Sequence, residues 1–84
     1  MSSSDNISLH VLTPEATVLD RKVSKVSLPG TKGRFMILKD HAPLISSLEE
    51  GDVVFEAEGT EERICILSGF VEVTSNMVTV CAEI

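Results

Sequence analysis

The fold class of this chain is decided by the stretch Phe70-Val71-Glu72-Val73-Thr74-Ser75-Asn76-Met77-Val78-Thr79-Val80-Cys81-Ala82. Apolar side chains recur at every second position on both sides of Ser75-Asn76, which is the pattern of half-buried β-strands. Two residues between such segments form a hairpin turn, and Asn tolerates the positive φ that this turn requires. The stretch therefore predicts a β-hairpin with strands over Phe70–Thr74 and Met77–Ala82.

The same period of two extends toward the N-terminus, and no segment has a sustained helical period. Turn signals rich in Gly, Pro, Asn and Asp recur about every 8–12 residues, as in sandwiches and barrels. The pattern predicts an all-β, flattened sandwich or barrel of about eight to ten short strands. The further strands are expected at Ile7–Leu12, Glu15–Leu19, Val23–Leu28, Arg34–Leu38, Leu44–Leu48, Val53–Ala57 and Arg63–Leu67.

Length and charge narrow the classes of protein. The 84 residues suffice for one domain, which we expect over residues 7–84 after a disordered polar tail of residues 1–6. A net charge of −6 and 4% aromatic residues argue against nucleic-acid binding. The longest apolar runs are four residues, Phe35–Leu38 and Ile64–Leu67, far short of a membrane helix. The N-terminus lacks the basic and apolar regions of a signal peptide.

The residue pattern does not indicate a catalytic site or a metal-binding site. Cys65 and Cys81 have no CxxC spacing and no nearby His, so we interpret them as reduced, buried, small hydrophobic residues of a cytosolic protein. Lys39-Asp40-His41 groups three titratable side chains without a nucleophile beside them. Pro29–Gly33 lacks the residue order and the following helix of a phosphate loop. The sequence predicts no catalytic, cofactor-binding or metal-ligating residue.

Two strands carry more apolar residues than the core of a two-layer sandwich needs, and this excess is the feature that indicates a function. In a two-layer sandwich each strand has an apolar inner face and a polar outer face, but Phe35–Leu38 and Ile64–Leu67 are apolar on both. A strand masked by a loop, or scattered surface apolar residues, would account for this. The alternative is an outer face that meets a partner protein. The residues predicted for this interface are Phe35, Ile37, Cys65 and Leu67.

An ordered set of motifs along nearly the whole chain resembles the N-terminal β-sandwich domain of the epsilon subunit of rotary ATP synthases. The motifs lie at Leu9–Pro14, Val26–Phe35, Ile37-Leu38, His41–Ile45, Ser68–Val73 and Asn76–Val80. The resemblance implies a non-catalytic rotor subunit of the central stalk, with no cofactor. It would couple the gamma subunit to the membrane c-ring in proton- or sodium-driven ATP synthesis.

The resemblance also implies partners and a location. Contacts with the polar loops of the c-ring correspond to Lys32, Gly33, Arg34, His41, Ala42 and Pro43, while gamma would meet Phe35, Ile37, Cys65 and Leu67. The family often has an acidic residue in place of Arg34, so a different charge pairing at the ring is expected. The subunit would lie peripherally at the cytoplasmic face of the inner cell membrane, touching the membrane only through the complex. Family members usually continue into a C-terminal helical hairpin, whereas this sequence ends at Ile84, where the sandwich is expected to finish. The subunit either has no hairpin or continues beyond this sequence.

A carrier domain of the lipoyl or biotinyl kind is the alternative. Such domains are also small, acidic and all-β. They carry a modifiable Lys at a hairpin tip in a Met-Lys-Met or Asp-Lys context, whereas Lys39-Asp40 has the reverse order and lies in a loop with Pro43.

Overall fold

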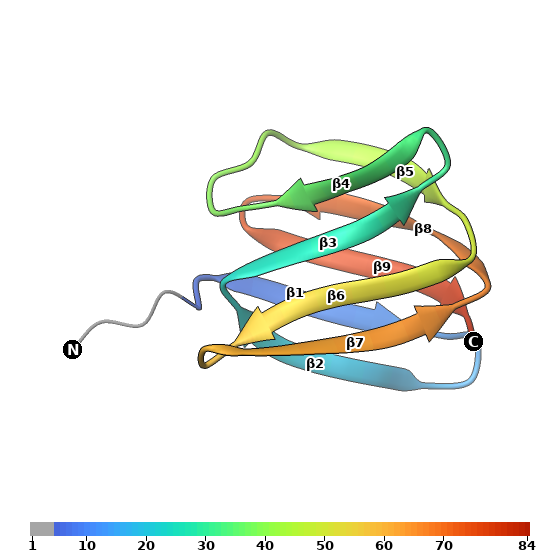
Figure 1. Ribbon diagram of the computed structural model, residues 1–84, viewed down its shortest axis with the longest axis horizontal. Coiled ribbons are helices and arrows are strands. Elements are labelled where there is room, and N and C mark those ends of the chain that lie inside the picture. The colour runs from blue at the N-terminus through green and yellow to red at the C-terminus, as the bar shows by residue number, and fades with distance from the viewer. Residues whose placement is uncertain (1–4) are drawn as a thin grey trace.

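The computed structural model describes residues 5–84, which form nine β-strands (Figure 1). Residues 1–4 of the predicted tail lie outside the described residues. Asp5, within that tail, accepts a hydrogen bond from the Glu58 N–H at 2.9 Å. The strands are β1 Ile7–Leu12, β2 Thr17–Val23, β3 Lys25–Gly30, β4 Gly33–Ile37, β5 Leu44–Leu48, β6 Gly51–Ala57, β7 Thr60–Ile66, β8 Ser68–Thr74 and β9 Met77–Glu83.

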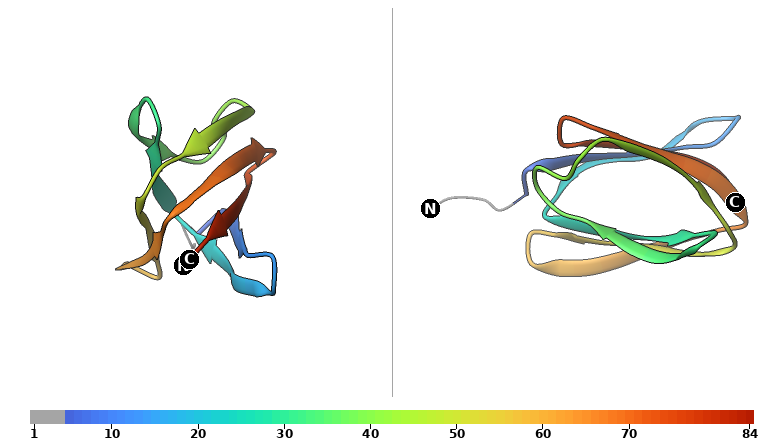
Figure 2. Two further views of the ribbon diagram at one scale, coloured as in Figure 1. Left: turned by 90° about the vertical axis from the view of Figure 1, so that its right-hand side faces the viewer. Right: turned by 90° about the horizontal axis from the view of Figure 1, so that it is seen from above.

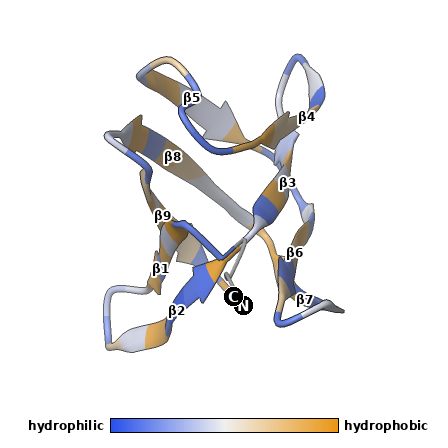
Figure 3. Ribbon diagram, turned by 90° about the vertical axis from the view of Figure 1, so that its left-hand side faces the viewer, coloured by the Kyte–Doolittle hydropathy of each residue, from blue (hydrophilic) through white to orange (hydrophobic). Residues whose placement is uncertain are grey.

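One hydrogen-bonded sheet curls on itself into two facing layers (Figures 2 and 3). The first layer has the order β2-β1-β9-β8-β5, and the second has the order β4-β3-β6-β7. They are joined where Gly30 of β3 pairs with Leu48 of β5. Among the described strands, β1 and β9 pair in parallel and the other pairs are antiparallel. The predicted all-β sandwich is confirmed.

The β8–β9 hairpin forms as its sequence predicts. Thr74 pairs with Met77, and Ser75 and Asn76 have φ values of 49° and 63°. Positive φ at both central residues matches the twist of the flanking strands, which makes this turn type favourable in hairpins. Glu58-Gly59 connects β6 to β7 in the same way, with φ values of 53° and 76°. This turn is shorter than the expected tip at residues 58–62.

Pro29 and Gly30 belong to β3 rather than to the predicted turn, which is confined to Thr31-Lys32. Pro29 pairs with Arg34 of β4, and its carbonyl accepts a hydrogen bond from the Glu49 N–H at 2.8 Å. The nitrogen of Pro29, which carries no hydrogen, faces the same side of β3 as its carbonyl. On that side the pairing of β3 with β6 ends at Ser27. A proline is tolerated there because no ladder donor is required.

The core lies between the two layers, and most strands contribute to it by alternation of buried and outward-facing residues. In β1 the burial alternates from Ile7 to Leu12, and Val78, Val80 and Ala82 of β9 continue the same inner surface. The buried apolar residues are Ile7, Leu9, Val11, Val23, Val26, Leu28, Ile37, Leu48, Val53, Phe55, Ala57, Ile66, Val71, Val73, Val78, Val80 and Ala82. Burial of these side chains is the main force that holds so small a domain together.

Ile37→Ala is expected to lower the free energy of unfolding by about 2–3 kcal/mol, because Ile37 is only 1% exposed and its truncation leaves a cavity. Met36→Ala, on the neighbouring residue that is 47% exposed, should cost less than about 0.5 kcal/mol. Urea denaturation followed by circular dichroism measures both. Equal losses for the two variants would contradict the assigned facing of β4.

Candidate partner-binding surfaces

No group of three His, Cys, Asp or Glu side chains in residues 5–84 is placed to hold a metal. Within the same part of the chain, no helix is long and apolar enough to cross a membrane. The described surface carries shallow grooves and exposed apolar residues.

An apolar patch lies on the outer face of the first layer, and we call its residues Leu12, Ile45, Phe70 and Cys81 the outer patch. Cys81 pairs with Leu12 on one side and with Phe70 on the other, so the three side chains form a row across β1, β9 and β8. Ile45 lies diagonally to Phe70, because Ile45 pairs with Glu72 of the same strand. Phe70 is 50% exposed and Ile45 is 75% exposed.

A shallow groove deepens this patch at the end nearest the chain terminus. Leu12, Pro14, Phe70 and Cys81 contribute to its wall. A second groove beside it includes Val18, Leu67 and Ile84, all of them exposed apolar residues. The apolar surface therefore continues from the middle of β8 to the β7–β8 junction.

The outer patch was not predicted, because its residues lie outside the four-residue apolar runs Phe35–Leu38 and Ile64–Leu67. The adjacent apolar pairs Val11-Leu12, Leu44-Ile45 and Phe70-Val71 do indicate outward-facing apolar residues on these strands. Successive residues of a strand point to opposite faces, so one member of each pair must face outward. Val11 and Val71 are buried, and their neighbours form the patch.

Four residues were predicted as an outward apolar interface, and they divide into two groups. Cys65 and Leu67 are exposed, as that prediction requires. Ile37 is buried in the core and Phe35 packs partly buried against it, so their predicted outward facing is wrong. The reason is phase: β4 directs Phe35 and Ile37 inward, and it is Met36 that faces solvent. Both cysteines are free, but neither is buried as expected: Cys65 is exposed, and Cys81 is half-buried in the outer patch.

The residues predicted to face the c-ring lie at the two ends of β4, along the upper edge of the molecule in Figure 1. Lys32 and Gly33 are exposed at the β3–β4 turn. Ala42 and Pro43 are exposed in the β4–β5 loop, and His41 beside them is half-buried. The His41 Nδ1 lies 2.7 Å from the Ala42 carbonyl oxygen.

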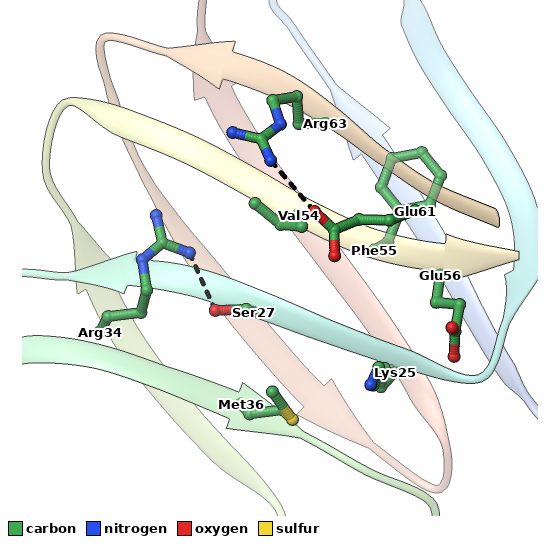
Figure 4. A pocket seen from close by; sticks show the side chains of 9 residues that line it. All are labelled: Lys25, Ser27, Arg34, Met36, Val54, Phe55, Glu56, Glu61 and Arg63. Carbon is green, nitrogen blue, oxygen red and sulfur yellow. Dashed lines mark hydrogen bonds and ion pairs between the residues drawn. The ribbon is translucent and has the colours of Figure 1, made fainter.

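Arg34 differs from the others because its guanidinium lies over the outer face of the second layer (Figure 4). It donates to Ser27 Oγ at 2.8 Å and to the Asp52 carbonyl at 2.6 Å, which links β4 to β3 and β6. Arg63 in the same groove contacts Asp52 at 3.3 Å and Glu61 at 3.0 Å. Both guanidinium groups thus have partners within the chain, so the groove is a polar surface with internal pairing.

Exposed apolar residues gathered on one sheet face, as in the outer patch, mark surfaces that bind other proteins. The family model described as the beta-sandwich domain of the ATP synthase delta/epsilon chain matches residues 6–84. The chain belongs to this ATP synthase delta/epsilon family.

Individual relatives agree with this assignment. The chain is 45% identical over 75 residues to the ATP synthase epsilon chain of Desulfitobacterium hafniense, with 89% of this chain and 57% of the relative covered. It is 44% identical over 79 residues to that of Carboxydothermus hydrogenoformans, with 94% and 59% covered. The chain therefore spans somewhat over half the length of these curated relatives.

Two solved structures share the fold. A chain of the mitochondrial ATP synthase of Euglena gracilis, described as OSCP/F1/c-ring, matches with a TM-score of 0.87 at 21% identity, covering 93% of this chain and 51% of that one. A chain of the Tetrahymena thermophila enzyme, described as central stalk/c-ring, matches with a TM-score of 0.78 at 12% identity, covering 99% and 67%.

Proposed function

We propose that this chain is a non-catalytic coupling domain of the ATP synthase central stalk, which transmits rotation between the gamma subunit and the membrane c-ring. The observation that carries the proposal is the exposed outer patch in a member of the epsilon family. An apolar sheet face in contact with water is unfavourable, and a partner that covers it gains the hydrophobic free energy.

Gamma is assigned to the outer patch. Phe70 lies between Cys81 and Ile45 in the outer patch, and Leu12 lies beyond Cys81 on β1. Aromatic side chains at the centre of an interface contribute most of its binding energy. Leu67 borders the adjoining groove, whereas Cys65 lies on the other layer. We therefore retain Leu67 near the gamma interface and place Cys65 outside it.

The c-ring is assigned to the upper edge of Figure 1, where Lys32, Gly33, Ala42 and Pro43 are exposed. This edge is approached from a different direction than the outer patch, so both partners can be bound together. Arg34 reaches the ring only by leaving its bonds to Ser27 and Asp52. The ring contact is therefore assigned to the two loops rather than to this guanidinium.

The charge of the chain fits a peripheral position. A net charge of −6 is repelled by anionic lipid headgroups, so membrane contact is expected only through the complex, at the cytoplasmic face of the inner membrane. Proton- or sodium-driven rotation of the ring would reach gamma through this domain. A carrier function has less support, because the family model that matches residues 6–84 is that of the ATP synthase delta/epsilon chain.

Ala42→Glu is expected to weaken binding to a detergent-solubilised gamma–c-ring complex by roughly tenfold, because it places a larger charged side chain at the ring contact. Thr60→Glu adds the same charge at an exposed position on β7, at the opposite edge, and should bind as the unmodified chain does. Surface plasmon resonance with immobilised complex measures both. Normal binding of Ala42→Glu would contradict the assignment of the ring to this edge.

A further inference from the structure

Two loops far apart in the sequence are joined by the side chains of Asp40 and Asn76. The Asp40 backbone N–H donates to Asn76 Oδ1 at 2.6 Å, and Asn76 Nδ2 donates to Asp40 Oδ1 at 3.0 Å. The Asn76 carbonyl accepts a third hydrogen bond, from the Ser8 N–H at 2.9 Å. Asn76 of the β8–β9 turn therefore holds both the first turn of the β4–β5 loop and the beginning of β1.

The backbone at both residues has the conformation that this contact needs. Asp40 and Asn76 each have a φ of 63°, in the left-handed region that Asp and Asn adopt more readily than other non-glycine residues. The bend at Asp40 lets the His41 N–H donate to the Leu38 carbonyl at 3.2 Å. It also directs the chain into the exposed segment Ala42-Pro43. The loop thus has a defined conformation although it lies between strands.

We propose that Asn76 is a positioning residue that fixes the β4–β5 loop in the conformation presented to the c-ring. The inference rests on the proposed function. It also connects the two partner surfaces structurally. Strand β8 carries Phe70 of the outer patch, and the turn that follows β8 holds the β4–β5 loop through Asn76. Preorganisation of a loop strengthens binding because less conformational entropy is lost on contact.

The test compares Asn76→Gly with Ser75→Gly. Glycine keeps the positive φ of the turn, so Asn76→Gly removes the amide side chain with little change to the backbone. Ser75→Gly makes the same change at a φ of 49° and leaves Asn76 in place. Asp40→Asn serves as the conservative variant, since it retains the backbone N–H and the Oδ1 acceptor.

The first measurement is amide hydrogen exchange by NMR on the 84-residue chain. In Asn76→Gly the Asp40 amide should exchange roughly tenfold faster than in Ser75→Gly. The reason is that the β4–β5 loop can then open without breaking the hydrogen bonds between Asp40 and Asn76. Amides of β1 and β9 in the core should be unchanged. The second measurement is affinity for the solubilised gamma–c-ring complex, which should fall roughly tenfold in Asn76→Gly and stay within about twofold in Ser75→Gly and Asp40→Asn.

Unchanged exchange at Asp40 in Asn76→Gly overturns the inference. Faster exchange with full affinity also overturns it, since the loop would then need no positioning. The Ala42→Glu variant separates this failure from that of the proposed function. If Ala42→Glu binds weakly while Asn76→Gly binds normally, the ring contact stands and the role of Asn76 is wrong. If both bind normally, the loop is not the ring contact.

Discussion

Phe70→Asp is expected to weaken association with the gamma subunit by about 100-fold while the domain stays folded. Phe70 is 50% exposed and lies at the centre of the outer patch, so a carboxylate there meets solvent in the free chain. In the complex the same carboxylate would be buried against apolar surface without a partner, which costs several kcal/mol. Isothermal titration with purified gamma measures the affinity, and thermal melting checks the fold.

Cys65→Asp is the matched control for this experiment. Cys65 is also exposed and lies on β7 of the opposite layer, so the variant places the same charge on the other outer face. Its affinity for gamma should equal that of the unmodified chain. Weak binding by Cys65→Asp together with normal binding by Phe70→Asp would move gamma to the β7 side, where the sequence-based prediction had placed it.

Gly69→Ala should destabilise the domain by about 3 kcal/mol or more, although it changes the residue next to Phe70 by one methyl group. A Cβ at Gly69 would collide with the Cys81 carbonyl oxygen and lie 2.9 Å from the Ala82 Cα. Both atoms belong to the backbone of β9, which pairs with β8 along its full length, so neither can move without breaking the ladder. The φ of 157° adds to the cost.

Gly59→Ala isolates the steric part of this loss. Gly59 has a φ of 76° and nothing within 4 Å of the added Cβ, so its variant carries only the conformational penalty, about 1 kcal/mol. Urea denaturation of both variants gives the difference. A loss at Gly69 no larger than that at Gly59 would show that β9 adapts to the methyl group.

Period-two alternation was sufficient to predict the strands, because the residues that alternate also fill the core. Val71, Val73, Val78 and Val80 are buried as the hairpin pattern implies. The least accurate boundary is the end of β2, which extends to Val23 instead of the expected Leu19. In β3, Pro29 and Gly30 extend the strand although these residues are typical of a turn. Their conformation depends on Glu49 and Arg34, which reach them through tertiary pairing that a local pattern does not contain.

The candidate surfaces were harder to predict from the sequence, for two physical reasons. Residue type was given more weight than strand phase, so Cys65 was expected to be buried although Ile64 and Ile66 on either side of it point inward. Arg34 was expected at the ring, but Ser27 and the Asp52 carbonyl come from other strands and hold it on the second layer. Sheet register, which brings these groups together, is not visible in the sequence.

The parallel pairing of β1 with β9 has a consequence for biosynthesis. Within this domain the first strand to be translated, β1, pairs with the last, β9, so Leu9 and Val11 are incompletely covered until residue 83 has been translated. Such long sequence separation slows folding. A nascent chain that ends before β9 therefore has an incomplete sheet with exposed apolar residues. Such partly folded chains are bound by chaperones and aggregate readily.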